Sequence, residues 1–371
     1  MKLTCDRAAL TDALSVCNHA VASKSPIPAL EGIRLSVNRK RMTLCAFDLK
    51  MSIEKIIEVD NDKPEDMILP AKVFSDIIRK VQGDEIYMET DKDLNVIIRC
   101  GRSEFNLKAE PGAGFPEVPY IGHNDGVYLP CSSLRQMITD TMFAISTNEN
   151  KPVHMGALFE VADNLLTVVS VDGYRLAIRK DDLYNPDNTK FSFVIPGTTL
   201  KELIHILPDD DQPVWIYPQA KHSMLEFNEI KLTTRLLDGD FINYRAAIPS
   251  DMPISMKINK DEVMAAVERV SLIISERLKN PIRCLFEQET LKLSCFTALG
   301  KSFDEVEIPF CPQTIEIGFN NRYLLDALRA CPGEEVILEL KSSLSPALFK
   351  PLEGDSFLYL VLPVRLKAED L

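Results

Sequence analysis

Two glycine-containing segments are the first candidates for phosphate chemistry. Gly300-Lys301-Ser302 matches the end of a P-loop, in which backbone amides and a lysine hold the phosphates of a nucleotide. The position of the first glycine of that motif holds Cys295, so the phosphate-binding turn is not specified. Gly112-Ala113-Gly114 begins a dinucleotide-binding pattern, but Glu117 stands in place of its third glycine. Neither segment predicts a nucleotide site.

Side chains that could bind a metal or act as a nucleophile are scattered. The 5 histidines show no metal-ligand spacing, and no G-x-S-x-G nucleophile elbow occurs. The run Asp209-Asp210-Asp211 lies between two prolines and is typical of a solvated loop. The 9 cysteines are odd in number and form no C-x-x-C pair, which indicates reduced thiols. We therefore expect a non-catalytic protein with no catalytic residue, no metal site and no cofactor.

Composition and charge narrow the class of protein. The chain has 371 residues, 46% hydrophobic and 26% charged, which is typical of a globular protein of two or three domains. It has no apolar run of about 18 residues and begins with a polar segment, so we expect neither a membrane span nor a secretion signal but a cytoplasmic protein. The net charge of −13 argues against a surface coated with DNA-binding charge.

The elements that must position any site occur three times along the chain. An amphipathic helix is predicted after Asp6, after Ser132 and after Asn259, and each of these residues is a plausible N-cap. A second helix is predicted after Leu69-Pro70, after Ile195-Pro196 and after Ile317-Gly318, and a β-strand follows it each time. β-rich stretches lie between the two helices of each copy.

This period is too long for a solenoid, so the sequence predicts three similar α+β domains. We expect them at residues 1–122, 128–248 and 252–366, followed by a short tail at 367–371. The economical packing places both helices of each domain on antiparallel sheets. The copies could merely stack, or they could build a curved or closed body.

The predicted helices carry a mild excess of basic residues with acidic residues interleaved. This pattern fits a solvated helix face. It also fits a surface that contacts DNA phosphates only weakly, because a mild excess of basic residues forms few tight phosphate contacts.

Two specific segments carry a family resemblance. The first is Val171-Asp172-Gly173-Tyr174-Arg175-Leu176-Ala177, and the second is the ending Tyr359-Leu360-Val361-Leu362-Pro363-Val364-Arg365-Leu366. With Leu237-Asp238-Gly239-Asp240-Phe241 and the triple repeat, they resemble the sliding clamps, the beta subunits of bacterial DNA polymerase III, over residues 1–366.

The resemblance implies the DNA clamp fold and a head-to-tail homodimer ring. The ring would encircle duplex DNA without regard to sequence, with the helices lining the hole. It would serve DNA replication as a processivity factor by tethering the replicative polymerase.

The resemblance also implies a hydrophobic pocket between the second and third domains that receives short peptide motifs. The partners would be the polymerase alpha subunit, the clamp loader delta subunit, and other polymerases and repair proteins. An apolar floor would come from Leu176, Leu362 and Val364, with polar edges from Arg175, Asn320 and Tyr323. The expected pocket positions are Val171, Gly173, Tyr174, Arg175, Leu176, Ile242, Asn320, Tyr323, Leu344, Pro346, Leu360, Leu362, Pro363, Val364, Arg365 and Leu366.

Some positions depart from the commoner pattern of the family and bear on the peptide preference. They are His154, Val171, Ile242, Ala246, Ala247 and Leu278.

Two further surfaces follow from the resemblance. For the dimer contact, Phe105 and Leu107 of the first domain would face Leu272 and Ile273 of the third. The expected DNA-contacting residues are Lys24, Lys72, Arg79, Lys80, Asn148 and Lys201.

Two other hypotheses stay open at this point. The chain could be a protein-binding hub that uses the same pocket but never encircles DNA. It could instead be an enzyme whose site is assembled across domains around Asp172 and Arg175.

Overall fold

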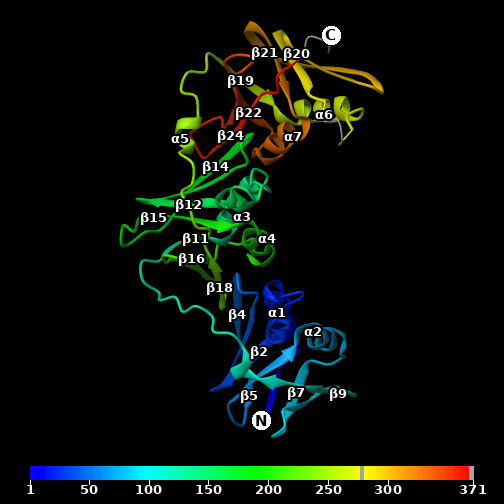
Figure 1. The fold of residues 1–371 in the computed structure, drawn as a ribbon, viewed down its shortest axis with the longest axis vertical. Helices are drawn as coiled ribbons and strands as arrows, with labels where there is room; N and C mark the ends of the chain where they lie inside the picture. The colour runs from blue at the N-terminus through cyan, green and yellow to red at the C-terminus, as the bar shows by residue number, and fades with distance from the viewer. Residues whose placement is uncertain (276–279, 367–371) are drawn as a thin grey trace. The chain divides into compact units, whose positions relative to one another are not determined.

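A computed structural model describes residues 1–275 and 280–366 of the chain (Figure 1). Leu278 and the tail at 367–371 lie outside the described residues. The chain divides into two compact units. The first comprises Met1–Ser132, Tyr184–Asp187 and Lys201–Leu236, and the second comprises Ser133–Leu183, Asn188–Leu200 and Leu237–Leu371.

The first unit contains two antiparallel sheets. The smaller sheet has the order β5 (Asp60–Asn61), β1 (Lys2–Asp6), β7 (Glu85–Thr90), β8 (Asn95–Cys100) and β9 (Ser103–Lys108). The larger sheet has the order β10 (Glu110–Pro111), β6 (Glu65–Pro70), β2 (Gly32–Asn38), β3 (Arg41–Phe47), β4 (Met51–Glu58), β18 (Ile230–Arg235), β17 (His222–Phe227), β16 (Pro213–Pro218) and β11 (Val127–Pro130). The pairing of β4 with β18 joins strands of two different repeats by main-chain hydrogen bonds.

Two helices of the first unit pack on each other and on the larger sheet. α1 (Arg7–Cys17) begins at Asp6, whose carboxylate accepts a hydrogen bond from the Ala9 amide at 2.7 Å, so this predicted cap is confirmed. The helix lies on β3 and β4 and buries Leu10, Ala13, Leu14 and Cys17, which share one face. α2 (Ala71–Lys80) contacts α1, β2 and β6.

The second unit repeats this arrangement. One antiparallel sheet has the order β15 (Phe191–Pro196), β12 (Gly156–Ala162), β13 (Leu165–Val171), β14 (Arg175–Asp182), β24 (Phe357–Val361), β23 (Ala347–Lys350), β22 (Glu335–Leu340) and β19 (Ile254–Asn259). The long strands β20 (Ile282–Thr297) and β21 (Gly300–Phe319) pair with each other. The pairing of β14 with β24 again joins strands of two repeats.

The helices of the third repeat pack together against these strands. α6 (Lys260–Ser271) contacts α7 (Asn321–Ala330) and lies on β19, β20 and β21. The Asn259 side chain accepts hydrogen bonds from the amides of Asp261 and Glu262, which confirms the predicted cap of α6. The short helix α5 (Tyr244–Ala247) precedes β19 along the chain.

The helices of the second repeat are α3 (Cys131–Met142) and α4 (Gly197–Ile206). The predicted cap at Ser132 is wrong, because α3 begins one residue earlier and contains Ser132. The Ser132 hydroxyl bonds to the Asp211 carboxylate at 3.1 Å, so a long-range contact uses the group expected to cap the helix.

The α+β class with antiparallel sheets is confirmed, and strands of successive repeats join edge to edge within each unit. All the cysteines are buried and free of disulfides. Among the residues that the structure describes, none of the helices has the length and apolarity needed to span a bilayer.

Candidate functional site

The motif of the second repeat forms a tight hairpin between β13 and β14. The Asp172 carboxylate accepts hydrogen bonds from the amides of Tyr174 at 2.8 Å and Arg175 at 3.1 Å. Gly173 has a φ of 94°, in the region that favours glycine because a Cβ would crowd the residue's own backbone there. The D-G-x-R spacing thus sets the turn and projects Tyr174 and Arg175 from its end.

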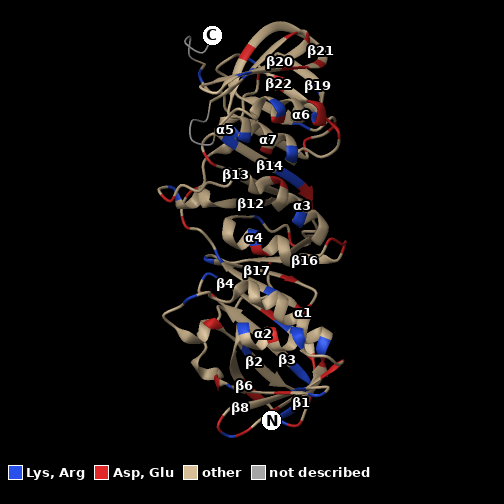
Figure 2. Ribbon diagram, turned by 90° about the vertical axis from the view of Figure 1, so that its right-hand side faces the viewer, with Lys and Arg blue, Asp and Glu red and all other residues tan. Residues whose placement is uncertain are grey.

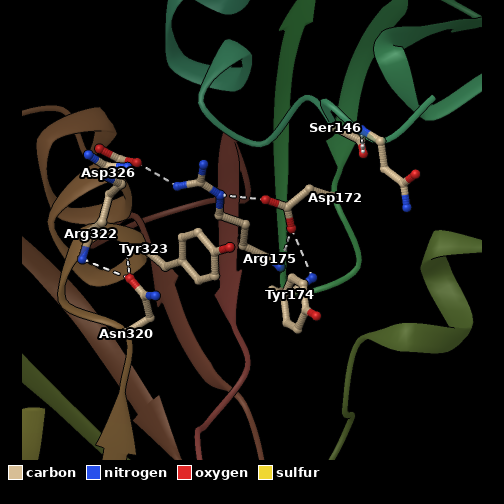
Figure 3. Close-up of polar contacts among 9 residues, drawn as sticks. Ser146, Asp172, Tyr174, Arg175, Asn320, Arg322, Tyr323 and Asp326 are labelled. Atoms are coloured by element: carbon tan, nitrogen blue, oxygen red, sulfur yellow. Dashed lines mark hydrogen bonds and ion pairs between the residues drawn. The ribbon is translucent and has the colours of Figure 1, made fainter. Parts of the chain in front are cut away.

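Arg175 is held from four sides (Figure 3). Its Nε donates to Asp172 at 2.9 Å, and its Nη1 donates to Asp326 of α7 at 2.5 Å. The guanidinium lies over the ring of Tyr323, 4.4 Å from the centroid, and 5.3 Å from that of Phe143. Only 11% of the side chain is exposed, so Arg175 links β14 rigidly to α7.

The aromatic and amide groups on α7 have different roles. Tyr323 lies beneath Tyr174, with ring centroids 5.9 Å apart, and burial raises the pKa of its hydroxyl. The Asn320 side chain accepts hydrogen bonds from the amides of Arg322 and Tyr323 and so caps α7. Its carbonyl oxygen is occupied by the cap, which leaves the amide NH₂ as the group that could contact a ligand.

Apolar residues adjoin this network along the β14–β24 pair. Leu176 faces Leu360 across the β14–β24 pair, and both are buried in one cluster with Val171. Leu362 and Val364 are each 38% exposed, and their amides donate to the carbonyls of Tyr174 and Gly318. Leu176 therefore lies in the core, whereas Leu362 and Val364 offer exposed apolar surface.

The other expected pocket residues vary in exposure. Leu344 is 68% exposed and Ile242 is 36% exposed. Pro346, Pro363 and Leu366 are half-buried, and Arg365 is exposed. Among the departures from the family pattern, Ala246 and Ala247 lie exposed on α5.

His154 is buried edge-on against Phe241, with ring centroids 5.6 Å apart. Burial lowers the pKa of this imidazole, and Lys151 lowers it further, so its neutral form is favoured. His154 therefore packs as an aromatic residue.

Sequence reasoning missed two residues of this site, Asp326 and Phe143. The available signal was weak: Asp326 follows Tyr323 by three positions, which places both on one face of α7. Nothing in the sequence pairs either residue with Arg175.

The residues expected at a dimer contact belong to two different units of the chain. β9 is an edge strand that carries Phe105, 38% exposed, and Leu107, half-buried. Leu272 at the end of α6 is 84% exposed, whereas Ile273 packs on the core of the third repeat. Leu299 (82%) and Phe303 (63%) are further exposed apolar residues at the β20–β21 hairpin.

The residues expected to contact DNA are all on the surface. Lys72, Arg79 and Lys80 are exposed on α2, where Arg79 pairs with Asp76. Basic and acidic positions are interleaved on this helix (Figure 2). Further expected contacts lie outside α2: Lys24, Asn148 and Lys201 are exposed, and the Asn148 side chain accepts a hydrogen bond from the Asn150 amide.

Three family models match consecutive parts of the chain. They are the N-terminal, central and C-terminal domains of the DNA polymerase III beta subunit, at residues 1–119, 128–243 and 245–365. Together they cover nearly the whole sequence.

Similar proteins agree over the full length. A beta sliding clamp of Staphylococcus epidermidis is 30% identical, covering 98% of this chain and 99% of that protein. The DNA polymerase sliding clamp of Bacillus subtilis has a similar structure, with 28% identity and a TM-score of 0.95 over 99% of this chain and 100% of that one. The clamp of Pseudomonas aeruginosa bound to griselimycin is 26% identical, with a TM-score of 0.93 over 99% and 100% of the two chains. The chain belongs to the DNA polymerase III beta subunit family, the sliding clamps, which are non-catalytic processivity factors that encircle DNA and bind partner proteins.

Proposed function

We propose that this chain closes head to tail with a second copy into a ring around duplex DNA, and that the site around Arg175 tethers the polymerase. The three domains would be residues 1–122, 128–248 and 252–366. The ring would act in the cytoplasm, and its partners would be the polymerase alpha subunit, the clamp loader delta subunit, and other polymerases and repair proteins.

The Arg175 network is the observation that carries the partner site. A guanidinium is fixed by two carboxylates and two aromatic rings, and the strand that pairs with its own leads into exposed Leu362 and Val364. Such a surface suits a short peptide, because apolar side chains gain from burial while a preformed polar group fixes orientation. Griselimycin, which the Pseudomonas aeruginosa clamp binds, is our probe for this site.

The dimer contact is supported by strand edges with exposed apolar residues. β9 leaves one edge of its sheet unpaired, and β21 pairs only with β20 among the strands of the described residues. The unpaired main-chain groups of two such edges could form hydrogen bonds with the strands of a second copy. Phe105 on β9, with Leu272, Leu299 and Phe303 of the third repeat, would be buried by that contact.

The interleaved charges on α2 suit a topological link to DNA. A ring that encloses the duplex needs no tight phosphate contacts, and weak contacts permit sliding. We propose that Lys24, Lys72, Arg79, Lys80, Asn148 and Lys201 make such contacts.

The test is retention on nicked circular DNA after loading by the cognate clamp loader, before and after the circle is cut. Release on linearisation supports the ring. Equal retention on both forms would contradict it and favour ordinary DNA binding. Failure to load, with partner binding retained, would favour a hub that never encircles DNA.

A further inference from the structure

The hairpin that begins β4 in the first unit has the same construction as the hairpin that begins β14. The Asp48 carboxylate accepts hydrogen bonds from the amides of Lys50 at 2.9 Å and Met51 at 2.7 Å. Asp172 accepts from the amides of Tyr174 and Arg175 in the same way. The Asp48 amide donates to the Met51 carbonyl at 3.1 Å, and the Asp172 amide donates to the Arg175 carbonyl at 3.3 Å.

The strand that joins each hairpin from the next repeat also matches. Arg235 at the end of β18 donates its amide to the Lys50 carbonyl at 2.8 Å. Leu362, just after β24, donates to the Tyr174 carbonyl at 2.8 Å. The first unit therefore contains a quasi-equivalent copy of the backbone frame that presents the site around Arg175.

The side chains on the hairpin that begins β4 differ from those on the hairpin that begins β14. Leu49 stands where the other hairpin has Gly173, and it has a φ of 73° and 48% exposure. A leucine at positive φ is rare because of steric clash, and the strain persists only where the surroundings enforce it. The turn thus holds an apolar side chain outwards at a position better suited to glycine.

Three cationic residues are linked to this turn through the backbone. Lys50 and Arg235 meet through their backbones, and the Leu236 amide donates to the Lys221 carbonyl at 2.9 Å. Lys50, Lys221 and Arg235 are all exposed, and among the described residues none of their side-chain cations forms an ion pair, although the Asp48 carboxylate accepts a hydrogen bond from the Lys50 amide. The pKa of His222, which lies opposite Arg235 in the β17–β18 pair, is lowered by burial and then by Arg235 and Lys221.

We propose that Leu49, Lys50, Lys221 and Arg235 form a second partner-docking surface, selective for an acidic peptide segment that carries an apolar side chain. Three unpaired cations complement several carboxylates, and Leu49 supplies an apolar contact that a phosphate backbone would not use. A partner with two such segments could occupy this surface and the site around Arg175 together, which raises its effective concentration. This inference rests on the proposed tethering function and assigns that function a second contact with different chemistry.

The test uses the full chain with the first site disabled by Leu362→Ser and Val364→Ser. The probe is a fluorescein-labelled peptide of alternating Asp and Leu, and its binding is followed by fluorescence anisotropy. Leu49→Gly removes the apolar group and relieves the strained φ, so the variant keeps its fold. It should weaken binding about 10-fold, the loss expected for one buried leucine.

Two further variants sharpen the test. The triple variant Lys50→Gln, Lys221→Gln and Arg235→Gln should weaken binding and flatten its dependence on salt, because the cations are gone. Leu352→Ser is the matched control, since Leu352 is 47% exposed and belongs to none of the proposed sites. It should bind the probe as the parent does.

Three results would overturn the proposal. The first is that the parent with its first site disabled does not bind the probe. The second is that the Leu49→Gly variant binds the probe with the same affinity as that parent. The third is that an oligothymidylate displaces the probe and binds equally well with and without Leu49→Gly. The last result would mark a nucleic-acid surface. Failure of the tethering function itself is read separately, from griselimycin binding and circular-DNA retention by the unmodified protein.

Discussion

Replacing Arg175 with alanine tests whether one side chain both joins two repeats and shapes the partner site. The substitution removes the hydrogen bonds to Asp172 and Asp326 and the contacts with Tyr323 and Phe143. It also leaves the Asp172 carboxylate, 13% exposed, without its cation, while Asp326, 25% exposed, keeps a longer ion pair with Arg329 at 3.9 Å.

The expected loss of stability follows from the burial of Arg175 and its two carboxylate partners. Removing one partner of a buried charge pair costs about 3–5 kcal/mol, and the partial exposure of the carboxylates places Arg175→Ala near the lower end. A loss of about 3 kcal/mol lowers the melting temperature of a unit of 150–250 residues by about 6–12 °C. Griselimycin affinity should fall at least about 10-fold, because the preformed polar edge is lost.

Arg245 provides a matched control. It also pairs with a carboxylate, Glu160 at 2.5 Å, and lies 4.6 Å from the ring centroid of Tyr244. Its side chain is 64% exposed, so water already screens these contacts. Arg245→Ala should therefore cost less than about 1 kcal/mol.

The assays are differential scanning calorimetry and griselimycin titration of both variants. Equal melting temperatures for Arg175→Ala and Arg245→Ala would refute the reasoning that burial makes Arg175 an anchor. A destabilised Arg175→Ala variant with unchanged griselimycin affinity would keep the anchor but remove Arg175 from the partner site.

Three further predictions address the rest of the molecule. Burial raises the pKa of Asp140 to about 6, so the native state binds the proton more tightly than the unfolded state and this carboxyl makes stability fall as pH rises from about 4 to 6. Between these two pH values the unfolding free energy of the Asp140→Asn variant, measured in urea, should fall by about 2 kcal/mol less than that of the parent. An equal fall in variant and parent would refute the raised pKa of Asp140. Leu272→Ala with Ile273→Ala should shift the protein towards monomer in light scattering, whereas an unchanged dimer mass would count against the proposed contact. Lys72→Gln with Lys80→Gln should lower the salt slope of binding to linear DNA by about two while retention on circles persists; an unchanged slope would mean that neither lysine contacts phosphate.

The order of residues along the chain is enough to predict the local elements and the number of copies. The α-helical repeat of about 3.6 residues per turn places Leu10, Ala13, Leu14 and Cys17 on one face of α1. Asn259 caps α6 because its short side chain reaches the free amides of the first turn. Such features depend on residues a few positions apart, so a pattern in the chain reveals them. The family resemblance also came from short motifs in the sequence, and it implied the family whose three domain models match the chain.

Which side chains meet across the chain depends instead on the packing of distant segments. Arg175 and Asp326 are 151 residues apart, and their pairing depends on how β14 and α7 pack. The same packing half-buries Ile273 against the core while leaving Leu272 exposed, although the two are adjacent in sequence. Burial and long-range ion pairs depend on the sum of many weak contacts between distant segments, and no local spacing encodes that sum.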